Sequence, residues 1–287
     1  MKRLLLILFA VFWLSGCHFP PRPTGWQLEN GRRVWLGPDG RPLSGWQQIE
    51  GKTYCLRDDG SPITGWLPGS DGTRYFAPDG ALCTGMHTIG GRVHFFAPSG
   101  VEVLLVNAQY PLPENYTVEV RSIGGGREIA ALCYDDLTAM LADCKAAGCR
   151  PAVCSAYRSM EKQTRLFRRK TAYFVRRGHP QAEAIQLAGT VVAAPGTSEH
   201  QLGLALDIVD AGHWDLDDSQ ENTPAQQWLL ANSWKYGFIL RYPKDKTRQT
   251  CVIYEPWHYR WVGRELAAEI QESGLCLEEF LGAVPAA

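Results

Sequence analysis

The chain has 287 residues, of which 45% are hydrophobic and 21% are charged. This composition excludes a disordered or collagen-like chain, and the length allows about two globular domains. Lys and Arg (29) nearly balance Asp and Glu (30), so no basic surface indicates a nucleic acid partner.

The N-terminal segment has the pattern of an export signal. Lys2 and Arg3 precede an uninterrupted apolar run over residues 4–14, which is too short to span a bilayer as a helix but typical of a signal-peptide core. The Leu-Ser-Gly-Cys sequence that ends at Cys17 resembles a bacterial lipoprotein box. It predicts a signal peptide over 1–17 and an extracytoplasmic protein, lipid-anchored at Cys17 to the bacterial membrane or associated with the cell wall. The alternative is an ordinary secretory signal with an unrelated cysteine.

Cysteine usage agrees with a location outside the cytoplasm. Apart from Cys17, eight cysteines remain: Cys55, Cys83, Cys133, Cys144, Cys149, Cys154, Cys251 and Cys276. An even number permits disulfides, but spacing does not decide their pairing, and free buried thiols are an equal alternative for several of them.

Residues 18–105 contain an internal repeat. Gly-Trp occurs at 25–26, 45–46 and 65–66, with Gly-Met at 85–86 as a weaker fourth copy. Asp-Gly follows the same period at 39–40, 59–60 and 79–80. Strand-like pieces lie at 33–36, 53–56, 74–76 and 93–96. We expect each unit to be a β-hairpin turning at Asp-Gly, and neighbouring units to stack into a solenoid.

The repeats resemble the cell-wall-binding repeats of bacterial surface proteins, whose best-known members bind choline in aromatic cages. The resemblance implies binding of a wall polymer, of which choline is one candidate ligand. The aromatic residues that could supply such cages are Trp26, Trp35, Trp46, Tyr54, Trp66 and Tyr75. The alternative is that these rings form only the core between repeats. Met86 and His94 make the last repeat a degenerate cap.

A Pro-containing stretch over 106–124 is expected to be the linker to a second domain, over 125–287. In this half, hydrophobic periodicity predicts an α+β fold. The expected helices are 127–148, 160–177, 181–193, 224–236 and 263–273, and the expected strands are 150–155, 204–209, 238–241 and 252–254.

Two fragments of this half carry metal-binding chemistry. His200 lies in a turn and Asp207 in a strand, and the two can converge on one ion if Gly203 allows a bend. Glu255 and His258 lie three residues apart in the second fragment. Two imidazoles and one carboxylate are a normal catalytic zinc set, so we assign His200, Asp207 and His258 to one Zn²⁺. Glu255 would be the base that takes a proton from the attacking water.

The order Ser-x-His-x-x-Gly-x-Ala-x-Asp followed by Glu-x-x-His is similar to the metal signature of the D-alanyl-D-alanine carboxypeptidase family of the VanY type. Here it reads SEHQLGLALD from Ser198 and EPWH from Glu255, and the likeness extends over about 125–282. The family implies a Hedgehog/DD-peptidase-like zinc peptidase fold.

A third segment, Ser155-Ala-Tyr-Arg-Ser followed by Gln163, is similar to the substrate-binding segment of that family. The resemblance implies that Arg158 is catalytic, holding the substrate and the transition state. It implies substrate contacts from Ser155, Tyr157, Gln163, Ser198 and Trp257. The alternatives are a structural ion pair for Arg158 and purely structural roles for Ser155 and Gln163.

The sequence therefore predicts a zinc metallo-carboxypeptidase, independent of a nucleophilic serine, that removes terminal D-Ala from peptidoglycan stem peptides (D,D-carboxypeptidase). An L,D-carboxypeptidase acting on tetrapeptide stems is the alternative within the same chemistry. A cell-wall-binding adhesin with structural zinc, in which Glu255 is a fourth ligand, is the alternative without catalysis. Whether the role is antibiotic resistance or routine wall maturation stays open.

Overall fold

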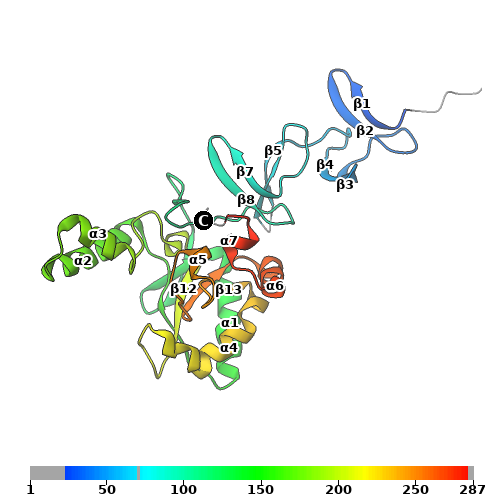
Figure 1. Cartoon of the computed structure of the whole chain (residues 1–287). Helices are drawn as coiled ribbons and strands as arrows, with labels where there is room; N and C mark the ends of the chain where they lie inside the picture. Colours follow the sequence, from blue (N-terminus) through cyan, green and yellow to red (C-terminus); the bar gives the residue numbers. More distant parts are fainter. Residues whose placement is uncertain (1–22, 70–71, 284–287) are drawn as a thin grey trace, which may run out of the picture. The chain divides into compact units, whose positions relative to one another are not determined.

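The computed structural model describes residues 23–69 and 72–283 (Figure 1). It contains two compact units: the first includes the residues up to Trp66 and Phe76–Leu82, and the second includes Leu67–Tyr75 and the chain from Cys83 onward. The expected signal segment and Cys17 lie outside the described residues. Among the residues that are described, no helix is long and apolar enough to cross a membrane.

The N-terminal repeats form small hairpins, each a separate two-stranded sheet. Their strands are β1 (Gly25–Glu29), β2 (Arg32–Leu36), β3 (Gly45–Ile49), β4 (Lys52–Leu56), β5 (Gly65–Gly69), β6 (Gly72–Phe76), β7 (Gly85–Ile89) and β8 (Arg92–Phe96). Each Gly-Trp marker, and Gly-Met in the last copy, begins the first strand of its hairpin. The prediction of short hairpins is confirmed.

The position predicted for the hairpin turn is wrong. The strands reverse at Asn30-Gly31, where both residues have positive φ (51° and 78°), and at Glu50-Gly51, with φ 51° and 77°. A two-residue turn with positive φ at both positions matches the twist of the flanking strands. Asp-Gly lies instead in the connection from one hairpin to the next, where the Gly40 N–H donates to the Gly37 carbonyl at 2.9 Å.

The fourth repeat shares a hydrophobic core with the C-terminal half. Phe95 of β8 and the following Val103 and Leu105 cluster with buried residues of the C-terminal helices, including Leu266 and Leu277. The segment expected to be the linker, 106–124, therefore lies in the sequence between residues that share one core. Apolar side chains on both sides of that stretch bury each other, so the larger unit begins within the repeats.

The C-terminal half is built on a four-stranded antiparallel sheet with the order β11-β12-β14-β13. The strands of this half are β9 (Val120–Gly124), β10 (Arg127–Ala130), β11 (Pro151–Ser155), β12 (Ala205–Asp210), β13 (Phe238–Leu240) and β14 (His258–Trp261). The helices are α1 (Tyr134–Ala146), α2 (Met160–Arg176), α3 (Gln181–Gly189), α4 (Pro224–Asn232), α5 (Thr247–Thr250), α6 (Arg264–Ser273) and α7 (Leu277–Phe280). This arrangement confirms the predicted combination of helices with antiparallel strands.

Three predicted elements differ from the structure. The expected helix over 127–148 begins as strand β10, which pairs with β9, and becomes helical only at α1. The expected helix over 181–193 ends at Gly189. Residues 252–254 are not a strand, and the next strand after β13 is β14, which lies inside the sheet between β12 and β13. In the first case, pairing with the neighbouring strand β9 overrides the local helical pattern.

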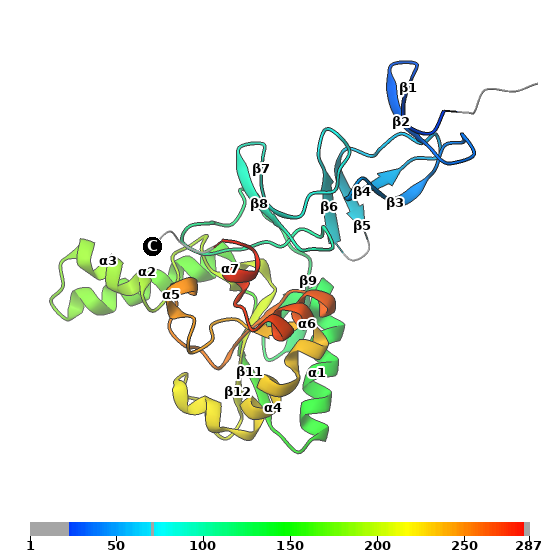
Figure 2. The same ribbon diagram turned by 45° about the vertical axis from the view of Figure 1, so that its right-hand side comes forward.

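The two faces of β12 have different roles. Leu206 and Ile208 join the main hydrophobic core, which includes Met140 of α1 and Leu229 of α4. The ribbons of these elements can be followed in Figure 2. Side chains alternate along a strand, so Asp207 points to the opposite face. In the register of the sheet, Asp207 stands opposite Ser155 on β11 and His258 on β14. The sheet therefore brings three of the predicted site residues side by side.

Candidate functional site

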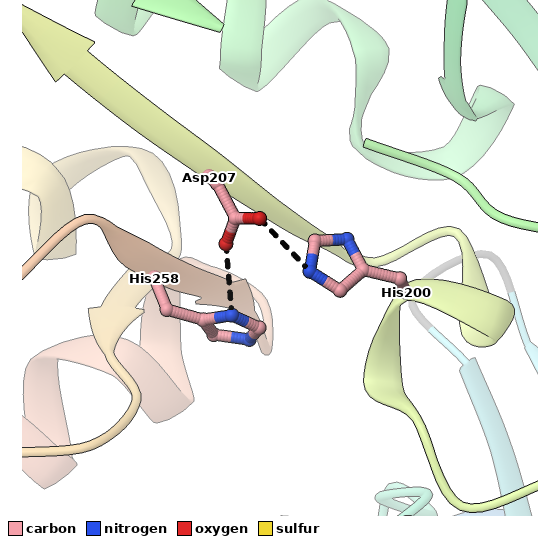
Figure 3. Close-up of side chains that lie close together, drawn as sticks. All are labelled: His200, Asp207 and His258. Carbon is pink, nitrogen blue, oxygen red and sulfur yellow. Dashed lines mark hydrogen bonds and ion pairs between the residues drawn. The ribbon is translucent and has the colours of Figure 1, made fainter. Parts of the chain in front are cut away.

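The structure brings together the three residues assigned to a metal, His200, Asp207 and His258 (Figure 3). His200 lies in a short 3-10 helix, Glu199–Leu202, which ends at Gly203 in the left-handed conformation (φ 74°). Gly203 turns the chain into β12, which brings the side chain of His200 close to that of Asp207. The bend that the sequence required at Gly203 is present.

The potential ligand atoms of this group all lie within 4.8 Å of one another. His200 Nε2 is 3.3 Å from Asp207 Oδ2, and His258 Nδ1 is 3.0 Å from Asp207 Oδ1. The three residues are at most 4% exposed. Burial of this kind makes an unpaired charge costly, and a bound cation is one way to compensate it.

The surroundings of His200 leave its Nε2 as the ligand atom. Its Nδ1 is 2.9 Å from the carbonyl oxygen of Ala156, which can only accept a hydrogen bond, so Nδ1 carries the proton. Burial lowers the pKa of His200 to about 4, despite the opposing charge of Asp207. Neutral imidazole is the form that binds a metal, and its lone pair faces a carboxylate oxygen. A cation between the two atoms would remove their repulsion.

His258 presents its Nδ1 to Asp207 and its Nε2 to Glu199. Burial disfavours its charged form, but the hydrogen bond to Asp207, the nearby Glu199 carboxylate and the charges of Asp207 and Glu255 raise its pKa to about 9. Nε2 has no hydrogen-bond partner within the usual distance among the described residues, and Glu199 Oε2 lies 3.8 Å away. An imidazole among carboxylates is a good ligand for a divalent cation. The donor set therefore fits a zinc site.

Glu255, the predicted base, lies beside this group. Its Oε2 is 3.6 Å from His258 Nδ1, and its side chain is 22% exposed, more than that of His258 or Asp207. Burial raises the pKa of the Glu255 carboxyl, and the nearby Asp207 contributes in the same direction. A carboxylate that is close to a metal group, partly open to solvent and raised in pKa suits general base catalysis.

Arg158 also belongs to the group. Its Nη2 donates to Asp207 Oδ2 at 3.2 Å, and its Nε and Nη2 donate to Ser155 Oγ at 3.0 and 2.8 Å. The side chain is 18% exposed, so it is largely buried beside Asp207 but retains some contact with solvent. Arg158 therefore makes the ion pair that a structural role would require. It does so at a position where a substrate carboxylate or oxyanion could also be bound.

The other predicted substrate residues are less directly placed. Gln163 is fully buried, and its Nε2 donates to the Ala193 carbonyl at 2.7 Å. This hydrogen bond attaches α2 to the segment that precedes His200. Ser198 and Trp257 are buried. In the sequence, Ser198 lies two residues before His200, and Trp257 lies directly before His258. Tyr157 follows β11 and is half-buried, with its backbone N–H bonded to Glu128.

Ser159 and Lys162 have the spacing of a serine nucleophile and its lysine, Ser-x-x-Lys. In the structure, Ser159 Oγ accepts a hydrogen bond from the backbone N–H of Lys162 at 3.2 Å and caps α2. This is the geometry of a helix N-cap, and it accounts for the spacing without a catalytic role.

Sequence reasoning missed Glu199. Its Oε1 accepts from Arg241 Nε at 2.8 Å and from Arg260 Nη1 at 2.9 Å, and Arg241 makes a bidentate pair with Glu278 of α7. All four residues are at most 2% exposed. The charges of the two arginines hold the pKa of Glu199 well below its usual range against the effect of burial. The sequence contained one signal for a role of Glu199 at the site, its position directly before His200.

The aromatic residues of the repeats divide into two sets. Trp26, Trp35 and Tyr54 pack on one another, with ring centroids 5.2 Å (Trp26–Trp35) and 5.1 Å (Trp26–Tyr54) apart, and Arg33 lies over the Trp26 ring at 3.7 Å. Trp46 and Trp66 are 52% and 43% exposed. Tyr75 is half-buried. The first set contributes to a small core, as the alternative expected, whereas Trp46 and Trp66 are partly exposed, and Trp46 also packs on Phe76 with ring centroids 5.7 Å apart.

Comparison with known proteins extends these observations. The family model for VanY, D-alanyl-D-alanine carboxypeptidase, matches residues 126–264. A D-alanyl-D-alanine carboxypeptidase of Enterococcus faecalis is 44% identical over 180 residues, which are 62% of this chain and 65% of that relative. The match therefore spans slightly less than two thirds of the relative's length.

Two solved structures are similar over almost their whole length. The vancomycin resistance D,D-pentapeptidase VanY from a VanB-type cassette, a mutant in complex with Zn(II), is 44% identical with a TM-score of 0.55. The likeness covers 62% of this chain and 97% of that one. The LD-carboxypeptidase LdcB is 33% identical with a TM-score of 0.55, over 70% of this chain and 95% of that one. The C-terminal half therefore has the VanY/LdcB-like peptidase fold.

Proposed function

The chain belongs to the VanY family of D-alanyl-D-alanine carboxypeptidases, and on that basis we propose that it is a zinc-dependent D,D-carboxypeptidase. Its substrates would be peptidoglycan stem peptides that end in D-Ala-D-Ala, the dipeptide bound in a solved structure of VanYB that is 44% identical to this chain. The observation that carries the proposal is the convergence of His200, Asp207 and His258 beside a free carboxylate, Glu255.

Each residue of the site has a role that its surroundings support. Zinc held by His200, Asp207 and His258 would supply positive charge that polarises the scissile carbonyl and eases deprotonation of water. Glu255 accepts the proton of the attacking water and returns it to the leaving amine of D-Ala. Arg158, anchored by Ser155 and Asp207, offers its remaining N–H groups to the substrate carboxylate or to the developing oxyanion.

Release of D-Ala from a synthetic pentapeptide stem tests the proposal. We expect the zinc-loaded protein to release one D-Ala, and Glu255→Gln to keep zinc while losing roughly 10²–10⁴-fold in kcat. Glu265→Gln, an exposed glutamate of α6, is the control and should retain full activity. Absence of D-Ala release from the pentapeptide by a protein with zinc bound would refute the D,D-carboxypeptidase function.

The second candidate is an L,D-carboxypeptidase. It is favoured by the likeness to LdcB, which covers 70% of this chain against 62% for VanY. Both activities would use the same metal group and base. A parallel assay with tetrapeptide and pentapeptide stems separates them, since D-Ala released only from the tetrapeptide would show the L,D-activity.

For the N-terminal part we propose export, lipidation at Cys17 and a stacked repeat domain that holds the enzyme on the wall. The exposed rings of Trp46 and Trp66 support a contact with wall polymer. Attachment of this kind would raise the local concentration of the substrate. The domain limits 18–105, 106–124 and 125–287 and the Hedgehog/DD-peptidase-like classification are part of the same proposal.

Sedimentation of the full chain with purified cell walls tests the repeats. We expect Trp46→Ala with Trp66→Ala to lower retention, while Trp214→Ala, an equally exposed tryptophan of the other half, leaves it unchanged. The whole chain is used because the fourth repeat shares its core with the C-terminal half. Equal retention of the double variant and the native protein would exclude binding through these rings.

A further inference from the structure

Helix α1 ends in a motif that brings two cysteines together. Gly148 follows the helix in the left-handed conformation, with φ 85°. Its N–H donates to the Lys145 carbonyl at 2.9 Å, and the N–H of Cys149 donates to the Cys144 carbonyl at 3.2 Å. These two bonds define a Schellman motif, in which the residue after the glycine packs against the third residue from the helix end. Here both of those residues are cysteines.

The side chains of the pair also lie near each other. Burial raises the pKa of the Cys144 thiol, and the neighbouring Cys149 thiol contributes in the same direction. Disulfides join residues whose Cα atoms lie about 4.4–6.8 Å apart and whose Cβ atoms face each other. The direct backbone hydrogen bond between Cys149 and Cys144 provides the short range that this geometry requires.

The remaining surroundings favour pairing of these two cysteines with each other. Cys144 is fully buried in the main core, and Cys149 is half-buried, with Sγ 3.4 Å from the Pro224 carbonyl. The nearest cysteines in sequence are directed elsewhere. Cys133 Sγ is 3.4 Å from the Ala130 carbonyl, and Cys154 Sγ is 3.4 Å from the Asp207 carbonyl.

We propose that Cys144 and Cys149 form a disulfide in the exported protein. The step needs a disulfide oxidant, either a small molecule or a thiol oxidoreductase. The Cys149 thiolate attacks the oxidant to form a mixed disulfide, and the Cys144 thiolate then displaces the second thiol. One S–S bond forms between the two residues, the S–S bond of the oxidant breaks, and two thiols with their protons leave.

The bond would fasten the end of α1 to the start of β11. It lies at the opposite end of β11 from Ser155, which neighbours the metal group, so turnover should not depend on it. The closed loop is short, and its effect on the unfolded chain is therefore modest. We expect reduction to lower the Tm by roughly 4–8 °C.

Peptide mapping of the native sequence tests the proposal without any variant. The purified protein is equilibrated with glutathione disulfide, unfolded, alkylated with iodoacetamide and digested with trypsin without reduction. Trypsin cuts after Lys145, and Pro151 protects the bond after Arg150, so the two cysteines fall in peptides 128–145 and 146–158. The expected product is these two peptides joined, with Cys133 and Cys154 alkylated. Alkylated Cys144 and Cys149, or Cys144 joined to any other cysteine, would overturn the proposal.

Thermal unfolding with and without dithiothreitol gives the second measurement. We expect the shift in Tm to persist in Cys251→Ser, which removes an exposed thiol, and to vanish in Cys149→Ser. An undiminished shift in Cys149→Ser would assign the redox effect to other cysteines and contradict the proposal. Neither experiment involves D-Ala release, so the result is independent of the proposed enzymatic function.

Discussion

Glu199 shows how a single buried carboxylate can serve both the fold and the site. It receives hydrogen bonds from Arg241 and Arg260, and its second oxygen faces His258 Nε2 at 3.8 Å. A carboxylate behind a metal-binding imidazole fixes the orientation of the ring and raises its basicity. Glu199 therefore directs Nδ1 of His258 toward Asp207 while it compensates two buried positive charges.

Replacing Glu199 by Gln should weaken both functions. The two arginines would lose a shared negative charge, which we expect to lower the free energy of unfolding by about 3 kcal/mol. The affinity for zinc should fall roughly 10–100-fold, as measured by competition with a chelator. Glu221→Gln, which affects an exposed pair with Lys244 and a hydrogen bond with Tyr254, should change the free energy of unfolding much less and leave the zinc affinity unchanged. Equal zinc affinity in Glu199→Gln and the native protein would show that Glu199 does not position His258.

The cysteines differ in reactivity according to burial. Burial raises the pKa of the Cys133 thiol to about 12, so only about one molecule in 10⁴ carries its thiolate at pH 8. Iodoacetamide should label the exposed Cys251 of the folded protein at pH 8 and leave Cys133 unmodified over the same period. The thiolate fraction of Cys133 rises tenfold with each unit of pH below 12, and its slow labelling should increase accordingly. Mass spectrometry of the tryptic peptides measures both rates, and labelling of Cys133 as fast as Cys251 would contradict its burial.

At the scale of elements, the turn between the 3-10 helix and β12 decides the site. Gly203 has φ 74°, and a Cβ added there would lie 3.3 Å from both Cβ and N of Ala130. Gly203→Ala therefore adds a tight contact to an unfavourable backbone conformation, and we expect a loss of about 2 kcal/mol in stability together with weaker zinc binding.

Gly274→Ala is the matched control for this turn. Gly274 has φ 66°, and a Cβ added there would meet no atom within 4 Å. Gly274→Ala should lower the free energy of unfolding by about 1 kcal/mol, because only the backbone conformation becomes unfavourable, and it should leave the zinc affinity unchanged. Chemical denaturation and zinc competition measure the two effects. A zinc affinity in Gly203→Ala equal to that of Gly274→Ala would mean that the turn does not position His200.

The elements that sequence predicted correctly are those with local signals. The Gly203 bend and strand β12 follow from the short spacing between His200 and Asp207. The hairpin turns were misplaced because the turn residues change from copy to copy, with Asn30-Gly31 in the first repeat and Glu50-Gly51 in the second, whereas Asp-Gly recurs with the repeat period. Glu199 was missed because its partners Arg241 and Arg260 lie 42 and 61 residues later in the chain.

At the scale of the whole molecule, the sequence pattern distinguishes the repeats from the C-terminal half, and the last repeat packs with that half in the structure. Phe95 of the last hairpin is 2% exposed and lies in the core formed with the C-terminal helices. Repeat periodicity depends on local sequence, but burial depends on which apolar surfaces meet in the fold. The period therefore locates the repeats without locating the boundary of the folded unit.

Metal binding should stabilise the whole protein. Zinc at about 100 times its Kd would add roughly 2.7 kcal/mol to the free energy of unfolding, because the unfolded chain does not hold the three ligands together. Calorimetry should show a Tm roughly 5–10 °C higher with zinc than with a chelator. Asp207→Ala should abolish this shift, and Asp215→Ala, an exposed aspartate, should preserve it. A full shift in Asp207→Ala would place the metal elsewhere.

An anomalous difference map at the zinc absorption edge, from crystals of the zinc-loaded protein, tests the assignment of the site most directly. We expect one strong peak, with His200 Nε2, a carboxylate oxygen of Asp207 and His258 Nδ1 as its protein ligands, and Glu255 close to it but unbound. A peak at other residues would contradict the assignment, and Glu255 closing the site as a fourth ligand would contradict a catalytic zinc centre.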